Sequence, residues 1–311
     1  MKHYIGIDIG GTKCAVVQGD ENGNILGKIR MDTGNVHDTL ENIFSAVASF
    51  GPCEAIGVSC GGPLNEETGV IQSPPNLPGW DDIPITAMLR ERFGVPAYLR
   101  NDANACALAE WRWGAGKGTK NMIFLTFGTG LGAGLILNGA LYSGTNGNAG
   151  EAGHIRLMST GPVGYGKAGS FEGFCSGGGI AQLGKSLAEK HLTQGGTLPY
   201  KTEAITAKLL ADFARQGEPV AAETYRISGE KLGAGLSVLI DLLNPEAIVI
   251  GSIYARCEDL LRPHAAAVIG EEALEPSRQV CRLLPAALGE SIGDKAALIV
   301  AAEGLRNEKL C

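Results

Sequence analysis

The sequence predicts an α/β protein whose core is built twice. A strand, a glycine-rich turn and a second strand at residues 4–17 recur at residues 122–135, and such internal repetition indicates duplication. After an N-terminal run of strands, strand and helix patterns alternate, which is typical of layered α/β domains. A chain of 311 residues is long enough for two hydrophobic cores. We therefore expect two α/β domains, each built on a mixed sheet.

In the first half of the chain, apolar runs bounded by turn residues predict a three-stranded meander. Asn22-Gly23, a favoured hairpin dipeptide, separates its last two strands. Beyond the meander, apolar residues at helical spacing alternate with short β-branched runs. The predicted elements are strands near 5–9, 13–18 and 25–30, a helix at 39–49, a strand at 55–59, a helix at 83–93 and a strand at 97–100.

The second half begins with the same pattern and ends in helices. Strands are predicted at 121–127, 132–137 and 140–142, the last two separated by Asn138-Gly139. A long apolar helix at 229–243 stops before Asn244-Pro245, because proline disfavours helical backbone in the residue before it. A fully apolar strand at 246–250, typical of a buried parallel strand, leads to Gly251, and the last helix is expected at 296–305.

Composition excludes several classes of protein. The chain is 44% hydrophobic and 19% charged with a formal charge of −7, and it has no dense cluster of Lys and Arg, which argues against nucleic-acid or membrane-surface binding. No apolar stretch is long enough to span a bilayer, and the N-terminus does not resemble a signal peptide, so we expect a cytoplasmic protein. None of the eight cysteines forms a C-x-x-C pair, and we expect buried, reduced thiols.

Two glycine turns are candidate phosphate loops. Asp8 ends the first strand directly before Gly10, Gly11, Thr12 and Lys13. Glycine lets backbone N–H groups approach an anion closely, while a hydroxyl and a cation add to the site. Asp8 would repel a bare phosphate, so we assign it to Mg²⁺ or its water shell. The second candidate loop comprises Thr126, Gly128, Thr129 and Gly130. A single such hairpin is usually only a turn, but the pair in this order favours phosphate binding.

Asp102 is the candidate general base. It follows a predicted strand and precedes an apolar helical segment, which is where open α/β sheets place their ligands. A carboxylate there could accept the proton of a hydroxyl that attacks phosphorus. Asn101 and Asp102 are also good helix N-caps, so this segment alone leaves both interpretations open.

Four polar residues in glycine- or proline-rich surroundings could bind hydroxyl groups. They are Asn76, Glu151, His154 and Glu172. A carboxylate can accept from two neighbouring hydroxyls, and histidine can donate or accept according to its tautomer. Each could instead be a turn residue or a structural hydrogen-bonding group.

Taken together, these motifs resemble the ROK family of sugar kinases and repressors over nearly the whole chain. The matching segments are residues 8–13 (DIGGTK), 76–80 (NLPGW), 101–104 (NDAN), 126–132 (TFGTGLG) and 151–154 (EAGH). The resemblance implies the actin-like ATPase fold of hexokinase type, related to ribonuclease H, with two domains that close over ATP and a hexose. It implies Asp102 as base, the two glycine loops as phosphate sites, Gly251 on the nucleoside side, and Asn76, Gly62, Asn101, Glu151, His154 and Glu172 on the sugar side.

One segment departs from the family pattern. Many members carry three cysteines after the Gly-His pair that hold a structural zinc with that histidine, whereas residues 164–172 here read GYGKAGSFE. The glycines and Glu172 remain, but tyrosine and serine cannot supply the thiolate ligands of a closed zinc site. We therefore expect no zinc and no other protein-held metal cluster.

The resulting prediction is an ATP- and Mg²⁺-dependent hexose kinase, with glucose O6 as the first choice of acceptor. N-acetylmannosamine, N-acetylglucosamine and fructose kinases remain alternatives, as does a sugar-sensing ROK-type regulator. The first strand begins near residue 4, which leaves little room for a helix-turn-helix segment before it. We expect a sugar- and phosphate-binding domain at 1–117 with the C-terminal helix (296–311), a nucleotide-binding and dimerisation domain at 118–295, and a homodimer.

Overall fold

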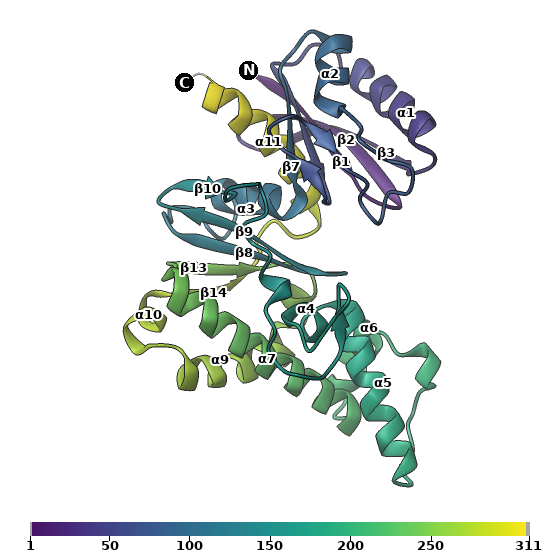
Figure 1. Ribbon diagram of the computed structural model, residues 1–311, viewed down its shortest axis with the longest axis vertical. Coiled ribbons are helices and arrows are strands. Elements are labelled where there is room, and N and C mark those ends of the chain that lie inside the picture. Colours follow the sequence, from purple (N-terminus) through teal and green to yellow (C-terminus); the bar gives the residue numbers. More distant parts are fainter. Residues whose placement is uncertain (1, 309–311) are drawn as a thin grey trace. The chain divides into compact units, whose positions relative to one another are not determined.

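The structure, a computed structural model, describes residues 2–308 and divides into two compact units (Figure 1). Unit 1 comprises the described residues up to Gly118, together with Leu141–Ala149 and the residues from Leu288 onward. Unit 2 comprises Thr119–Ala140 and Gly150–Ala287. The chain therefore passes between units at four points, after residues 118, 140, 149 and 287.

Unit 1 is built on a five-stranded mixed sheet in the order β3-β2-β1-β4-β7. Its strands are β1 (His3–Ile9), β2 (Lys13–Asp20), β3 (Ile25–Asp32), β4 (Ala55–Cys60) and β7 (Ala97–Asn101). The first three form the predicted antiparallel meander, whereas β1, β4 and β7 are parallel. A short hairpin, β5 (Leu64–Asn65) and β6 (Val70–Ile71), follows β4.

Helices cover both faces of this sheet. Alternate residues of β1 point to opposite faces: Ile5 and Ile7 pack in one core with α1 (Val36–Ser49) and α2 (Ile85–Phe93), whereas Tyr4 packs with α11 (Ile292–Glu308). α3 (Asp102–Trp113) packs against α11. The approach of α11 is very close, because a Cβ added at Gly57 would lie 2.3 Å from the Ala301 nitrogen.

Unit 2 repeats the same strand pattern in the order β10-β9-β8-β13-β14. These strands are β8 (Met122–Phe127), β9 (Leu131–Leu137), β10 (Ala140–Tyr142), β13 (Ala247–Ile250) and β14 (Arg282–Pro285). β8 pairs antiparallel with β9 and parallel with β13, which in turn pairs parallel with β14. The predicted duplication of a mixed-sheet core is therefore confirmed.

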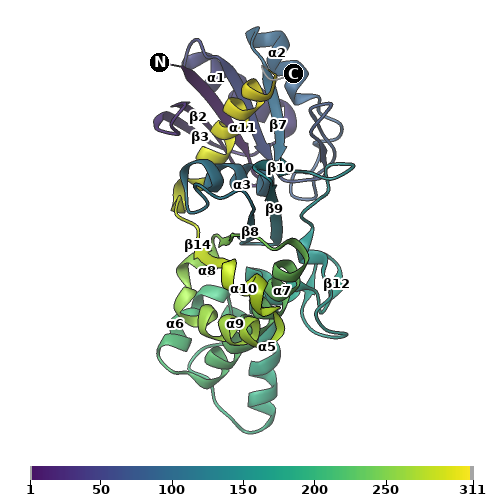
Figure 2. The same ribbon diagram turned by 90° about the vertical axis from the view of Figure 1, so that its left-hand side faces the viewer.

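Unit 2 is rich in helices, of which α7 is the longest. The helices are α4 (Phe171–Phe174), α5 (Gly177–Thr193), α6 (Ala207–Arg215), α7 (Pro219–Leu243), α8 (Ile253–Arg256), α9 (Glu258–Glu272) and α10 (Glu275–Val280), and a small hairpin pairs β11 (Val163–Gly164) with β12 (Lys167–Ala168). α7 packs against both α5 and α9 (Figure 2). Its contact with α9 depends on Gly229 and Gly233, since a Cβ at either would lie within 3 Å of α9 atoms.

Most predicted elements are present with shifted ends. The helix predicted at 229–243 begins ten residues earlier, at Pro219, because the Glu218 carboxylate caps it by accepting from the Val220 and Ala221 N–H groups. The helix predicted at 83–93 begins at Ile85, because Ile83 pairs with Ile71 in a β-bridge. The last helix begins at Ile292 and not at residue 296, and its predicted extension to 309–311 lies outside the described residues.

Two further observations concern the surface and the cysteines. Among residues 2–308, no helix combines the length and apolar character that a bilayer span requires. Cys14, Cys60, Cys175 and Cys257 are buried and three other cysteines are partly buried, while Cys311 lies outside the described range.

Candidate active site

The first part of the candidate site lies where three parallel strands of unit 1 end. In the register of this sheet Ile9 lies beside Cys60, and Cys60 lies beside Asn101. The residues that follow these positions are Gly10, Gly61 and Asp102. Parallel pairing therefore brings the first phosphate loop, the Gly61-Gly62 segment and the candidate base to one edge of the sheet.

The helix-capping alternative for Asp102 is decided by its neighbour. The Asn101 side-chain oxygen is the N-cap of α3, accepting from the Ala103 N–H at 3.0 Å and more weakly from the Asn104 N–H at 3.4 Å. Asp102 Oδ1 accepts from the Ala103 N–H at 2.8 Å. Asp102 Oδ2 lies toward Gly61, where an added Cβ would be 3.9 Å away. Asp102 is thus the first residue of the helix and is not needed as its cap.

Glu66 forms hydrogen bonds to this segment and was not predicted from the sequence. Its Oε1 accepts from the Asn101 N–H at 2.9 Å and from the Asn104 side-chain amide at 3.3 Å. Its other oxygen pairs with Arg100. Glu66 lies outside every motif, in a turn-rich loop, and only the fold brings it beside Asn101.

The pKa values of both Asp8 and Asp102 are raised above that of an ordinary aspartate. Burial raises the pKa of Asp8 to about 6, helped by the negative charges of Asp102 and Asp294 and opposed by Lys28 and Arg30. Burial also raises the pKa of Asp102, although the Ala103 N–H lowers it. Asp102 is exposed to solvent, yet the protein around it excludes enough water to disfavour its charged form.

The first glycine loop has the close backbone contacts that require glycine. The Gly10 N–H donates to the Lys13 carbonyl at 3.1 Å, closing the hairpin. A Cβ at Gly11 would lie 2.5 Å from the Asn76 carbonyl oxygen, so the predicted sugar-side Asn76, which is exposed, lies directly beside this loop. Gly62 lies beside Asn101, since its Cβ would be 3.7 Å from the Asn101 amide nitrogen.

The start of α11 lies against the Asp8 carboxylate. A Cβ at Gly293 would lie 2.8 Å from Asp8 Oδ2, and the buried Asp294 next to it forms an ion pair with Lys28. Among residues 2–308, no three His, Cys, Asp or Glu side chains lie close enough to hold a metal on their own. This arrangement fits Mg²⁺ carried by a nucleotide, because Mg²⁺ in such sites takes one or two carboxylates plus phosphate oxygens and water.

The second part of the candidate site lies in unit 2 and is described by itself. The Gly128 N–H donates to the Gly130 carbonyl at 3.0 Å, and Thr126 Oγ1 accepts from the Gly132 N–H at 2.9 Å. The Thr126 hydroxyl therefore shapes the hairpin. The Gly177 N–H at the start of α5 donates to the Gly128 carbonyl at 2.8 Å. The glycine loop is thus joined to a helix N-terminus, whose N–H groups favour anions.

Gly251 and Ser252 flank the same loop. The Gly251 N–H donates to the Leu125 carbonyl at 3.0 Å. A Cβ at Gly128 would lie 3.4 Å from the Ser252 hydroxyl. The structure thereby brings Gly251 next to the strand that delivers this phosphate loop. Thr129 lies at the tip of the hairpin, between Gly128 and Gly130.

The three predicted sugar-side residues of unit 2 differ in their surroundings. Glu172 Oε2 accepts from the Leu131 N–H at 2.9 Å, so this carboxylate is tied to the second glycine loop. His154 ends a short 3-10 helix and packs edge-on against Tyr165, with ring centroids 5.2 Å apart. Glu151 is exposed and makes no side-chain capping bond to that helix. Glu172 therefore positions the loop, whatever else it binds.

The residues around His154 do not fit a structural zinc. Tyr165 occupies one side of the imidazole ring. Ser170 caps α4 by accepting from the Gly173 N–H. Cys175 is buried and its thiol points to the Ser228 carbonyl, with a sulfur–oxygen distance of 3.6 Å. A single imidazole without neighbouring thiolates falls short of a four-ligand site.

A cavity of about 630 Å³ is lined in part by Gly177, whose N–H donates to the second glycine loop. It lies between the start of α5, α6 and α8 and is lined by Gly177, Ala181, Ala211, Tyr225 and Ile253 among others. Its lining is mainly apolar with a few polar and charged groups, which is typical of a small-molecule site. Sequence reasoning missed it, because the helices that enclose it carry no recognisable motif.

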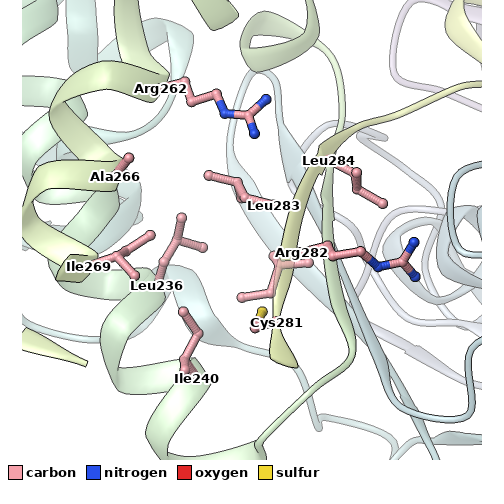
Figure 3. Close-up of a pocket in the computed structure, with 10 residues that line it drawn as sticks. Leu236, Ile240, Arg262, Ala266, Ile269, Cys281, Arg282, Leu283 and Leu284 are labelled. Carbon is pink, nitrogen blue, oxygen red and sulfur yellow. The ribbon is translucent and has the colours of Figure 1, made fainter. Parts of the chain in front are cut away.

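A second cavity, of about 340 Å³, is lined by neither Gly177 nor any residue of the two glycine loops. It lies between α7, α9 and β14, where the side chains of Leu236, Ile240, Ile269 and Leu283 converge and Arg262 stands at the edge (Figure 3). No carboxylate lines it, and none of the sequence-predicted site residues belongs to it. We therefore do not assign the chemistry to this cavity.

Comparison with known proteins identifies the family of the chain. A model of the ROK family matches residues 4–303. A glucokinase of Streptomyces coelicolor is 37% identical over 259 residues, which cover 79% of this chain and 80% of that protein. The crystal structure of a ROK family glucokinase from Streptomyces griseus, in complex with glucose and AMPPNP, is 32% identical, superposes with a TM-score of 0.79 and covers 97% of this chain and 100% of that chain.

Regulators share the same fold. A ROK family transcriptional regulator, a homolog of the Escherichia coli MLC protein, superposes with a TM-score of 0.83 at 24% identity, covering 96% of this chain and 77% of that chain. At that identity the likeness concerns the fold alone. The predicted actin-like ATPase fold is confirmed by the two duplicated sheets and by these structural relatives.

Replacing Asp8 by Asn should stabilise the protein at neutral pH but much less at acidic pH. The pKa of Asp8 in the folded state, about 6, lies above that of an unfolded chain. Below pH 4 Asp8 is protonated in the folded state and the stability is intact. As the pH rises through 6, Asp8 must ionise in its buried site, and the folded state progressively loses stability. Asn carries no such cost, so its advantage should grow by about 2 kcal/mol between pH 4 and pH 8.

Thermal unfolding of both proteins across this pH range, without nucleotide or Mg²⁺, measures the difference. A constant difference at all pH values would show that Asp8 is not held at a raised pKa.

Proposed function

The chain belongs to the ROK family and is a sugar kinase, and we propose that it transfers the γ-phosphoryl group of Mg-ATP to O6 of glucose. Glucokinases of this family are 32–37% identical to it over about four fifths of the chain. The observation that carries the chemistry is the placement of Asp102 at the joined ends of β4 and β7, within electrostatic reach of Asp8.

Asp102 acts as general base in the proposed reaction. Its carboxylate accepts the proton of the sugar hydroxyl while the hydroxyl oxygen forms a bond to the γ-phosphorus and the bond to the ADP oxygen breaks. A raised pKa makes Asp102 a stronger base than an ordinary aspartate. Asn101 holds the start of α3 in place, so the carboxylate keeps its direction.

The remaining predicted residues are assigned to ligand binding. In this proposal the backbone N–H groups of residues 10–13 and 126–130 bind phosphate oxygens, with Thr12 and Lys13 adding a hydroxyl and a cation. Mg²⁺ bound with the nucleotide, held by Asp8 directly or through water, would neutralise charge on the phosphate oxygens. Asn76, Gly62, Asn101, Glu151, His154 and Glu172 are assigned to the sugar, and Gly251 to the nucleoside side.

The cavity beside α5 is assigned to the adenosine part of ATP. It adjoins Gly177, whose N–H is bonded to the second phosphate loop, so a nucleotide with its phosphates on that loop would direct its base toward the cavity. Its mainly apolar lining suits a purine ring.

The first test measures ADP release with Mg-ATP and a panel of acceptors: glucose, fructose, mannose, N-acetylmannosamine, N-acetylglucosamine and a β-glucoside. We expect glucose to be the preferred acceptor. A clear preference for an N-acetylated sugar or for fructose would replace glucose but keep the kinase. A folded protein that binds ATP and phosphorylates none of them would favour a sugar-sensing regulator.

The role of Asp102 is tested by Asp102→Asn, which keeps the shape and can still accept from the Ala103 N–H. We expect kcat to fall by about 10²- to 10⁴-fold, because a general base is lost, with sugar affinity within a few fold of wild type. Glu91→Gln on the exposed surface of α2 serves as the control. A kcat within a few fold of wild type would exclude Asp102 as the base.

Filling the cavity tests the adenosine assignment. Ala181→Trp should raise the KM for ATP by about tenfold or more, because the indole would occupy space needed by the base, and should leave the KM for the sugar unchanged. Ala222→Trp, on the exposed side of α7, is the matched control. An unchanged KM for ATP would show that the base binds elsewhere.

The proposal also includes a cytoplasmic homodimer without structural zinc. The family resemblance supports the dimer, and the ligand set around His154 supports the absence of zinc. Light scattering measures the mass in solution. Elemental analysis after dialysis should find far less than one zinc per chain, and a stoichiometric amount would contradict the proposal.

A further inference from the structure

The carboxylate of Glu110 is fully buried in α3, with 0% of its surface exposed. Its two oxygens accept backbone hydrogen bonds from two segments that are far apart in the sequence. Oε2 accepts from the Ala115 N–H at 2.8 Å. Oε1 accepts from the Leu288 N–H at 2.9 Å.

These two N–H groups belong to the segments through which unit 1 continues into unit 2. Ala115 lies in the stretch that ends unit 1 at Gly118, and Leu288 is the first residue after the chain returns. Glu110 therefore holds two of the four places at which the chain passes between units, after residues 118, 140, 149 and 287. Both contacts lie wholly inside unit 1.

The segment that leads out of unit 1, residues 114–118, contacts Glu110 closely. The Gly114 and Gly116 N–H groups both donate to the Glu110 carbonyl, each at 3.0 Å. A Cβ at Gly114 would lie 2.0 Å from Glu110 Oε2, so only glycine fits there. The backbone of this segment is thus fastened to α3 by both the main chain and the side chain of one residue.

The returning segment leads directly to the candidate site. Leu288 precedes the short 3-10 helix Gly289–Ser291, and α11 follows at once, with Gly293 beside Asp8. The outgoing segment follows α3, the helix that begins with Asp102. The Arg112 Nε donates to Glu303 at 2.8 Å and ties α3 to α11. Glu110 therefore contacts the segments next to both α3, which begins with Asp102, and α11, which begins beside Asp8.

We propose that Glu110 is a positioning residue for phosphoryl transfer, because it anchors both connecting segments at one point of α3. This inference rests on the proposed kinase function. Kinases of this reaction class need their reacting groups held in a narrow geometry, and a misplacement of about 1 Å can cost on the order of 10²-fold in rate. Both the segment that leads out of unit 1 and the segment that leads back into it are thus held by the Glu110 side chain.

The chemistry of the side chain suggests the variant. A carboxylate offers only acceptors, whereas glutamine has one accepting oxygen and one donating NH₂ group. Glu110→Gln keeps the side-chain volume, but its oxygen can accept from only one of the two N–H groups. Its NH₂ group then faces the other N–H, so two donors meet. Asp20→Asn is the matched control: Asp20 is 6% exposed in the same unit, and its Oδ1 accepts from the Asn22 and Asn24 N–H groups in the turn between β2 and β3.

The experiment compares wild type, Glu110→Gln and Asp20→Asn at a temperature at which all three are folded. Amide hydrogen exchange at residues 114–118 and 287–289 reports whether the segments are held. Steady-state kinetics report kcat and the KM for the sugar and for ATP. We expect Glu110→Gln to exchange at least about tenfold faster in both segments and to lose at least about tenfold in kcat, whereas Asp20→Asn retains both wild-type exchange in these segments and wild-type kcat.

The outcomes separate the possibilities. Unchanged exchange in either segment would overturn the anchoring, and faster exchange with unchanged kcat would show that Glu110 is structural only. An equal loss of kcat in Asp20→Asn would assign the effect to general destabilisation and overturn the proposal. If wild type phosphorylates no sugar, both the proposed kinase function and this role of Glu110 are wrong. If wild type is active and Glu110→Gln shows unchanged exchange or unchanged kcat, only the role of Glu110 is wrong.

A second pair of variants removes one contact without changing Glu110. Leu288→Pro eliminates the N–H that donates to Oε1, and the backbone of Leu288, with φ of −81°, suits proline. Leu288→Ala keeps the N–H and controls for the lost side chain. We expect the kcat of Leu288→Pro to lie at least about fivefold below that of Leu288→Ala. Equal values would overturn the proposal even if Glu110→Gln does not fold.

Discussion

The parallel pairing of β1, β4 and β7 is the constraint on which the candidate site depends. Because parallel strands end at the same edge of a sheet, residues far apart in the sequence meet there. The register places Ile9 beside Cys60 and Cys60 beside Asn101, so the residues after them converge. The charge of Asp102, more than ninety positions away in the sequence, raises the pKa of Asp8 only for this reason.

Glycine permits the close packing that this arrangement requires. α11 crosses β1 and β4 at Gly6 and Gly57, where any side chain would collide with its backbone. This contact brings the start of the helix, at Gly293, against Asp8. The site has an energetic cost, because burial and neighbouring carboxylates raise the pKa of Asp8, and perturbed groups of this kind concentrate where proteins do chemistry. Glu66, which accepts from the Asn101 N–H, and Asn101, which caps α3, hold the neighbouring strand end and helix start together.

Sequence reasoning recovered the elements whose signal is local. The meander, both glycine hairpins and the buried strand at 247–250 follow from alternation, turn dipeptides and β-branched runs, and all are present. It misplaced the start of α7 because the stretch after Pro219 carries polar residues within a helix that other helices bury. It missed α5, α6 and α9, which pack against α7, and the cavity between α5, α6 and α8, because helix packing partners cannot be identified from local patterns.

The sequence by itself determined the family, the duplicated α/β architecture and the identity of the candidate groups, because motif spacing and residue chemistry are properties of the chain alone. Only the tertiary structure showed which residue caps the helix: Asn101 is the N-cap of α3, and Asp102 is its first residue. It also showed that Glu172 binds the backbone of the second loop, that Glu66 supports the first site, and that Glu110 joins two remote segments. These are contacts between residues distant in sequence, and no local pattern encodes a partner that folding alone brings near.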